Sequence, residues 1–373
     1  NTGVKEIPVQ YTRKQIFEFA ESELLAIENE LKVPGSNEYG RVDRVAGWFL
    51  LARMYLNAQT WINENKYQEA YIYATKVIAD GHYPLASDYR EIFLADNNTC
   101  KEIIWPLVQD GLRAQSSAGT NFYVKAFVNG PMDELYKTGV GSRGWGNVRA
   151  KVSLVDAFDA DDVMFDGNDI WGNNKKDKRA QFMTALPNQV KDTWDVNMDM
   201  TSTFTCGYGY IKWRNVTKED ELSASGDAYT SIDFPLFRTA DAYLMAAEAI
   251  LRGASGTKSE ALGYVNEVRT RAYMSGKYAK NGVRSDVSGE IGANELDLDF
   301  LLLERQKELA SELIRRTDLI RFGKYTKGNN WDWKNGVRLG EDVDDKYNLF
   351  PIPESELTNN PTLVQNDGYK VIK

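Results

Sequence analysis

Histidine and cysteine are nearly missing from this chain of 373 residues, which has one histidine and two cysteines. Catalytic triads and metal sites built on histidine would all depend on His82, which lies between Gly81 and Pro84 in a predicted surface turn. Cys100 and Cys206 are too few and too far apart to predict a disulfide framework or a zinc site. The composition therefore argues against these classes of enzyme and metal protein.

Long apolar runs and an excess of positive charge are also absent. No stretch approaches the ~18 uninterrupted apolar residues that a membrane-spanning helix needs. The formal net charge is −9, which would repel a phosphate backbone, so nucleic acid is not expected as a partner. The chain is longer than the ~250–300 residues at which one hydrophobic core stops growing. We therefore expect two lobes or a stacked, repetitive architecture.

Proline is missing from residues 35–83 and 236–350. Apolar residues recur there at helical spacing and predict two helical hairpins. The four stripes are Val45, Phe49, Ala52 and Leu56; Tyr67, Ala70, Ala74 and Val77; Ala240, Leu244, Ala247 and Leu251; and Ala261, Val265, Val268 and Ala272. Within the second hairpin, Gly253 predicts a helix end, and Thr257 with Glu260 predicts a capping box that starts the next helix.

Ten of the 21 residues from 304 to 324 are charged, and both signs are interleaved. A single helix over 300–321 would place Glu304, Glu308 and Glu312 at successive i,i+4 positions, which is unfavourable unless cations compensate. The predicted local pairs are Arg305 with Glu308, Arg315 and Arg316 with Glu312, and Arg321 with Asp318. A glycosidase would instead need one protonated and one ionised carboxylate across a cleft, so we interpret the segment as scaffold.

Residues 105–235 have a different character, because clusters of glycine, asparagine, aspartate and serine predict loops. Large aromatic residues are frequent in this region: Tyr123, Tyr136, Trp145, Trp171, Trp194, Tyr208, Tyr210 and Trp213. Loops carried on a rigid scaffold are a usual place for recognition. An acidic run from Asp156 to Asp169 departs from the spacing of a calcium loop, and we interpret it as a helix end with solvated turns rather than a metal site.

Four segments resemble the SusD/RagB family of outer-membrane nutrient-binding lipoproteins. They are "GRVDRVAGWFLLARMYL", "DFPLFRTADAYLMAAEAILRG", "LLLERQKELASELIRRTDLIRFGKYT" and "YNLFPIPESELTNNPTLVQNDGY", which occur in the family's order and span nearly the whole chain. The first also resembles the first helix of a tetratricopeptide repeat. Family members are longer at the N-terminus, where a lipidated cysteine and the first repeats lie, so the anchor is expected outside this chain.

The resemblance implies a mainly α fold, in which tetratricopeptide-like helical repeats pack against a less regular, loop-rich lobe. Residues 1–98 would be the end of the N-terminal repeat region, and residues 99–373 would be the C-terminal region with a ligand-binding excursion at about 105–235. It implies a lipid-anchored protein on the cell-surface face of the outer membrane. Such a protein captures oligosaccharides and passes them to a SusC-like TonB-dependent transporter, with no cofactor and no catalysis.

A sugar-binding surface needs flat aromatic side chains for the C–H faces of the rings and polar groups for the hydroxyls. Arg143, Trp145 and Asn147 lie together in a glycine-rich loop, which also resembles a family segment near which ligand contacts often lie. Trp145 is our first candidate for ligand binding. The further candidates are Tyr123, Trp171 and Tyr208. Trp48, Trp61 and Trp105 are predicted to be in the core.

Three alternatives to sugar capture remain open from the sequence. An oligopeptide-capturing member of the same family would use a groove that reads charge or backbone. A glycoside hydrolase would release reducing sugar, and it would lose activity when one carboxylate is neutralised. A helical-repeat scaffold for a protein partner alone would show an apolar surface patch without a polar and aromatic cleft.

Overall fold

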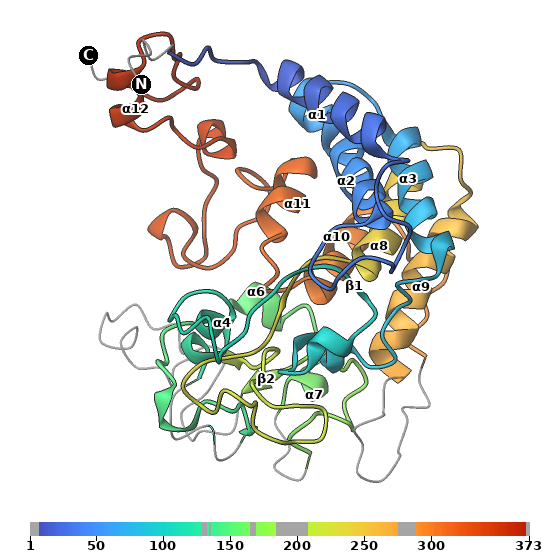
Figure 1. Ribbon diagram of the computed structural model, residues 1–373, viewed down its shortest axis with the longest axis vertical. Coiled ribbons are helices and arrows are strands. Elements are labelled where there is room, and N and C mark those ends of the chain that lie inside the picture. The colour runs from blue at the N-terminus through green and yellow to red at the C-terminus, as the bar shows by residue number, and fades with distance from the viewer. Residues whose placement is uncertain are drawn as a thin grey trace.

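Helices dominate the computed structural model, which describes residues 7–128, 133, 136–164, 169–183, 208–274 and 288–370. In Figure 1 the long helices lie together on one side, and the described short elements and loops between residues 105 and 235, here called the loop-rich lobe, lie below them. The described helices are α1 (Arg13–Ile27), α2 (Arg44–Ile62), α3 (Tyr67–Asp80), α4 (Thr120–Ala126), α6 (Val152–Val155), α7 (Ala160–Val163), α8 (Thr239–Leu251), α9 (Lys258–Met274), α10 (Leu298–Glu308), α11 (Arg315–Arg321) and α12 (Glu354–Asn359). The prediction of a mainly α fold with a less regular lobe is confirmed.

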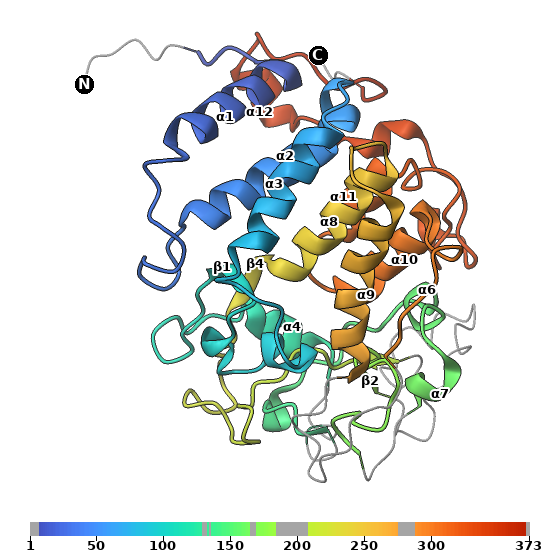
Figure 2. The same cartoon turned by 90° about the vertical axis from the view of Figure 1, so that its right-hand side faces the viewer.

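Helices α1, α2, α3, α8 and α9 lie side by side in that order (Figure 2). Both hairpins predicted from the sequence are present, as α2 with α3 and α8 with α9. Because α8 packs on α3, segments on both sides of residue 98 share one core. The division of the chain at residue 98 and the assignment of these helices to tetratricopeptide repeats stay predictions.

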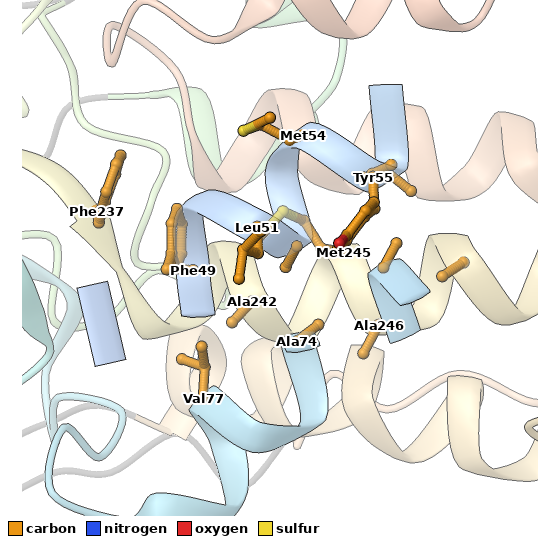
Figure 3. Close-up of a cluster of buried hydrophobic side chains, with 14 of the residues drawn as sticks. Phe49, Leu51, Met54, Tyr55, Ala74, Val77, Phe237, Ala242, Met245 and Ala246 are labelled. Carbon is orange, nitrogen blue, oxygen red and sulfur yellow. The ribbon is translucent and has the colours of Figure 1, made fainter. Parts of the chain in front are cut away.

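The predicted apolar stripes form the centre of this helical layer. Ala52 of α2 and Ala74 of α3 are fully buried, and small side chains at these points let the helix backbones approach closely. Figure 3 shows Phe49, Leu51 and Tyr55 of α2 in one cluster with Met245, Ala242 and Ala246 of α8. A second cluster joins α8, α9 and α10, so α8 has a core on two sides.

Helix α9 begins as its capping signal predicts. The backbone N–H of Thr257 donates to Glu260 Oε2 at 2.7 Å, and the backbone N–H of Glu260 donates to Thr257 Oγ1 at 3.2 Å. The preceding helix α8 ends at Leu251, and Gly253 follows with a φ of 108°, a conformation that favours glycine. Both boundaries of this turn were therefore readable from residue types alone.

Strands are short in the described residues. Strand β1 (Ile103–Leu107) pairs antiparallel with β4 (Phe234–Arg238), and β2 (Phe182–Met183) pairs antiparallel with β3 (Gly209–Tyr210). The first pair brings the entry and the exit of the loop-rich lobe together beneath the helices. No helix in the described ranges is both long and apolar enough to cross a bilayer.

The single predicted helix over 300–321 is wrong. The segment forms α10 and α11, and between them Ser311 and Leu313 adopt left-handed φ values of 61° and 63°. Leu313 is 75% exposed because the chain turns there. This turn directs Glu312 to Arg238 of β4, whose guanidinium binds both carboxylate oxygens at 2.6 and 2.8 Å. That bidentate pair offsets the cost of the left-handed backbone.

Candidate functional site

Trp145 lies on a loop that the end of α4 holds in place. The loop follows a 3-10 turn at Gly141–Arg143. The backbone N–H groups of Trp145 and Asn147 donate to the carbonyls of Lys125 and Ala126 at 2.7 and 2.8 Å. The loop is therefore fixed by backbone hydrogen bonds and does not depend on burial of the tryptophan side chain.

The indole ring of Trp145 is available to a ligand. Trp145 is 38% exposed, and the indole N–H has no hydrogen-bond partner among the described residues. Phe122 of α4, which is 45% exposed, lies beside it with ring centroids 6.2 Å apart and an interplanar angle of 60°. These two rings form an exposed aromatic surface, which we call the Trp145 surface.

Polar groups border the Trp145 surface. Arg143 is exposed, and its Nε donates to Asp227 Oδ1 at 3.1 Å. Gly141 has a φ of 53°, and a Cβ there would lie 2.7 Å from Asp227 Oδ2, so glycine permits this close approach. Burial and the nearby charge of Arg143 lower the pKa of Lys125, which donates to the carbonyl of Ala228. Asn147 is exposed, so the surface combines rings with a cation and an amide.

The other candidate aromatics lie deeper. Tyr123 is half-buried, and its ring centroid lies 5.3 Å from that of Trp213 and 5.6 Å from that of Phe234. Trp171 is 7% exposed, and the guanidinium of Arg214 lies 4.3 Å from the centre of its ring.

Tyr208 is 8% exposed, and its carbonyl accepts from the backbone of Ala150. Burial withdraws Trp171 and Tyr208 from stacking with a surface ligand, so both are better explained as packing residues.

Several further interpretations from the sequence can be compared with the structure. His82 lies in an exposed turn, as predicted. Trp48 and Trp105 pack against the core, whereas Trp61 does not, since it is 36% exposed near the end of α2. Trp194 and Cys206 lie outside the described residues.

The acidic run does not form a set of solvated turns throughout. Asp156, Asp159 and Asp161 are exposed. Asp162 is buried, and its carboxylate accepts the backbone N–H groups of Lys176 and Asp177 at 2.7 and 3.0 Å. This aspartate organises a loop of the lobe.

The glutamates of the charged segment are buried in an ion-pair network. Glu304 binds Arg179 and Arg269, each at 2.6 Å, and Glu312 binds Lys212 at 2.5 Å and Arg238. Glu308 lies at the centre and accepts from three arginines, Arg179, Arg238 and Arg271. Among the residues that the structure describes, five carboxylates face five cations in this network: Asp177, Glu102, Glu304, Glu308 and Glu312 against Arg179, Lys212, Arg238, Arg269 and Arg271.

The scaffold interpretation of these charges holds, but most of the predicted partners are wrong. Arg305 pairs with Asp241 and Asp318, not with Glu308, and among the predicted local pairs Arg321 with Asp318 forms. Arg179 and Lys212 belong to the loop-rich lobe, whereas Glu304 and Glu308 lie on α10 and Glu312 lies in the turn after it. The network therefore ties the lobe to the helices. No group of three or more potential metal ligands is present among the described residues.

A cavity of about 370 Å³ opens between α6, the turn from α10 to α11, and residues 325–331. Its wall includes Trp331 and Tyr325, whose ring centroids lie 5.6 Å apart, together with apolar and basic side chains. The cavity was not predicted, because its walls combine residues 149–154 with residues 305–331, which are distant in the chain.

Comparisons with known proteins agree with the arrangement of helices and lobe. The sequence model of the SusD family matches residues 101–369. The chain is 32% identical to the starch-binding protein SusD of Bacteroides thetaiotaomicron, over 98% of this chain and 67% of that protein. It is 25% identical to the SusD-like protein P25 of Formosa agariphila, over 88% of this chain and 59% of that one.

Solved structures give the same fold at lower sequence identity. A SusD-like protein of Bacteroides fragilis superposes with a TM-score of 0.68 at 21% identity, covering 97% of this chain and 72% of that one. The surface glycan-binding protein A of Bacteroides thetaiotaomicron, solved in complex with laminarihexaose, superposes with a TM-score of 0.64 at 22% identity, covering 96% and 72%. A family model matches residues 101–369, and the alignment with the 32% identical relative covers 98% of this chain, so this chain belongs to the SusD family.

Proposed function

We propose that this chain is a glycan-binding protein that captures oligosaccharides at the cell surface without cleaving them. The observation that carries the proposal is the Trp145 surface, where two exposed rings on a fixed loop lie beside an exposed arginine and an exposed amide. Such a surface offers an apolar face to the C–H side of a sugar and polar groups to its hydroxyls. The starch-binding relative and the laminarihexaose complex of a structural neighbour support glycans as the ligand class.

The buried carboxylates support capture without hydrolysis. Burial alone would raise the pKa of Glu308, but the charges of Arg271, Arg238 and Arg179 hold it well below its usual range. Glu248 is governed by the same two effects, and Arg321 lowers its pKa to about 2. Carboxylates held in this way do not supply the proton that glycosidic bond cleavage needs.

We include delivery to a SusC-like TonB-dependent transporter at the outer face of the outer membrane, with attachment through a lipid anchor. This part rests on membership of the SusD family and on an open ligand surface from which a sugar can be released. A pull-down of the full-length, anchored protein from outer membranes, followed by identification of the barrel that co-purifies, tests it. Purification without such a transporter would contradict this part of the proposal alone.

The test of capture is calorimetric titration with maltoheptaose and laminarihexaose. Trp145→Ala should weaken binding by about tenfold or more. An aromatic side chain that the ligand covers on binding contributes roughly 1–2 kcal/mol, and about 1.4 kcal/mol is a factor of ten. Trp61→Ala is the matched control, because Trp61 is a comparably exposed tryptophan on α2. It should leave the affinity unchanged.

Three results would contradict the proposal in different ways. Equal affinities for wild type and Trp145→Ala would remove Trp145 from the site. No binding to either glycan, with binding to a peptide library instead, would favour the oligopeptide alternative. Release of reducing ends during prolonged incubation with the wild type would establish a hydrolase.

A further inference from the structure

The cavity of about 370 Å³ beside α6 has an unusual charge for this chain. Five cationic side chains and one carboxylate line it: Arg149, Lys151, Arg305, Arg315 and Arg316 against Asp318. The chain as a whole has a formal net charge of −9. A positively charged hollow in an acidic protein points to an anionic ligand.

The single lining carboxylate is already occupied. Asp318 Oδ2 accepts from Arg305 at 2.9 Å, and Oδ1 accepts from Arg321 at 2.7 Å. Arg305 is further paired with Asp241 at 2.8 Å. Asp318 therefore pairs with Arg305 and Arg321, and it forms no ion pair with Lys151, Arg315 or Arg316.

Arg315 has only neutral hydrogen-bond partners in the described structure. Its guanidinium donates to the carbonyl of Leu302 at 2.8 Å and to the side-chain oxygen of Gln306 at 2.7 Å. Burial lowers the pKa of Arg315 to about 10, and the more distant Asp318 does not restore it. A desolvated guanidinium with spare N–H groups is stabilised by a carboxylate that enters the cavity.

Arg316 likewise has only neutral hydrogen-bond partners among the described residues. It donates to the carbonyls of Tyr347 and Asn348 at 2.9 and 3.1 Å, and its guanidinium lies 4.9 Å from the ring centre of Tyr325. Lys151 donates to the carbonyl of Asp332 at 2.7 Å. Burial lowers the pKa of Lys151, and the charge of Asp332 opposes that change.

The rest of the wall suits a ring. Trp331 and Tyr325 present aromatic surface, and Leu154 and Leu309 add apolar contact. Ser153, Gln306 and Asn329 supply polar groups around it. The volume lies within the usual range of small-molecule pockets, about 300–1,000 Å³. The walls thus combine cations, flat rings and neutral hydrogen-bonding groups.

We infer that this cavity binds a sugar unit that carries a carboxylate, as in a hexuronate of an acidic glycan. The planar carboxylate pairs with the guanidinium forks of Arg315 and Arg316, and the sugar ring lies against Trp331 and Tyr325. The inference rests on the proposed function in taking a glycan as the ligand. The cavity is separate from the Trp145 surface, and it adds acidic sugars to the ligands expected for the protein.

The probe is trigalacturonate, and its fully methyl-esterified form is the uncharged control ligand. Trigalacturonate should bind about tenfold or more tightly than the ester at low ionic strength, and raising the salt to about 0.5 M should reduce the difference because added ions screen charges. Equal binding of acid and ester would overturn the inference. Preference for a sulfated trisaccharide over trigalacturonate would also overturn it, because a carboxylate would then not be the group recognised.

A substitution at Ser153 tests the site without removing any of its arginines. Ser153 lines the cavity, is exposed, and has no side-chain hydrogen bond among the described residues. Ser153→Glu brings a negative charge to the wall and should weaken trigalacturonate binding by about tenfold or more. Ser153→Gln, in which the new side chain has the shape of glutamate but no charge, should leave trigalacturonate binding unchanged. If both variants changed trigalacturonate binding to the same extent, the carboxylate of the ligand would not lie in this cavity.

Neutral glycans separate this inference from the proposed function. Ser153→Glu should leave maltoheptaose binding unchanged, and Trp145→Ala should weaken maltoheptaose more than it weakens methyl galacturonate. If neutral glycans bind and the acid shows no preference, the inference fails while the proposed function stands. If the acid binds at Ser153 and no neutral glycan binds, the Trp145 surface fails as the capture site.

Discussion

Glu308→Gln is the sharpest test of the buried network, because the substitution keeps the shape of the side chain and removes one charge. Glu308 is fully buried. Its Oε1 accepts from Arg238 at 2.6 Å and from Arg271, and its Oε2 accepts from Arg179 at 3.1 Å. A glutamine can keep its oxygen toward Arg238 and Arg271, but its NH₂ group then faces the N–H groups of Arg179.

The magnitude follows from these contacts. A hydrogen bond to a charged group contributes about 1.5–3 kcal/mol, and the substitution loses one such bond and weakens two others. The network, balanced at five charges of each sign, also gains a net positive charge. We expect the free energy of unfolding to fall by about 3–5 kcal/mol, which is the usual cost of removing one partner from a buried ion pair.

Urea unfolding followed by circular dichroism measures this loss. The midpoint should fall with an unchanged slope, since the surface exposed on unfolding stays the same. Glu38→Gln is the matched control, because Glu38 pairs with Arg41 at 3.1 Å on the open surface and should leave the midpoint unchanged. If both variants changed the midpoint equally little, the network would not hold the lobe to the helices.

The same variant has a predictable dependence on pH. A carboxyl whose pKa is lowered by folding stabilises the native state above its ordinary value of 4.5, and this stabilisation is lost as the pH falls through the folded-state value. Glutamine does not titrate. The difference in stability between wild type and Glu308→Gln should therefore be constant from about pH 6 to 8 and shrink below about pH 4.5. A difference that grew on acidification would refute the assigned direction of the pKa.

Two further substitutions test the helical layer by urea unfolding. Ala74→Leu should reduce the free energy of unfolding by about 1–3 kcal/mol, because a larger side chain overfills the contact between α2, α3 and α8 where Ala74 is fully buried; no loss would mean that the helices can separate there. Thr257→Ala should reduce it by about 1 kcal/mol through loss of the cap of α9, and Thr257→Ser should restore most of it; equal stability of the two variants would show that the cap contributes nothing.

The helical layer was predictable from the sequence because its signals are local. Spacing of apolar residues identifies a helix face within a dozen residues, and the capping box at Thr257 lies within four. The positions predicted to be buried in α2 and α9 are buried, including Phe49 and Val265. The prediction that Trp61 lies in the core is wrong, because an aromatic residue at the end of a helix can lie outside the packed stripe.

The network was predictable only in outline, because its partners are distant in the chain. Alternating charges on a presumed helix indicated ion pairing, but helical spacing can suggest partners only three or four residues away. The cations that bind Glu304 and Glu308 all lie 35 residues or more earlier in the chain, from Arg269 at 35 to Arg179 at 125 residues before Glu304. The local sequence between α10 and α11 does not distinguish a turn from a continued helix. The turn depends on contacts with distant residues, such as that of Glu312 with Arg238.

The candidate site shows the same division. Glycines around Trp145 predicted a loop, and a loop places a tryptophan at the surface more often than a helix core does. Phe122, which was not predicted, is adjacent to Tyr123 on α4, and one ring points outward while the other packs on Trp213. Composition alone could not predict which of these two residues is exposed, since the outward face of a short helix depends on what the helix packs against.

The carboxyl groups of the described residues also bear on the choice between capture and hydrolysis. Burial raises the pKa of Asp233, which is the condition that a catalytic acid requires. Its two oxygens, however, accept from the hydroxyl of Tyr39 at 2.5 Å and from the backbone N–H of Gln109 at 2.7 Å. Asp233 thus fixes the segment that leads from β1 to α4. A carboxyl held by two donors is engaged in fixing this segment, so the raised pKa of Asp233 has a structural cause, and the proposed capture of a glycan needs no catalytic role for it.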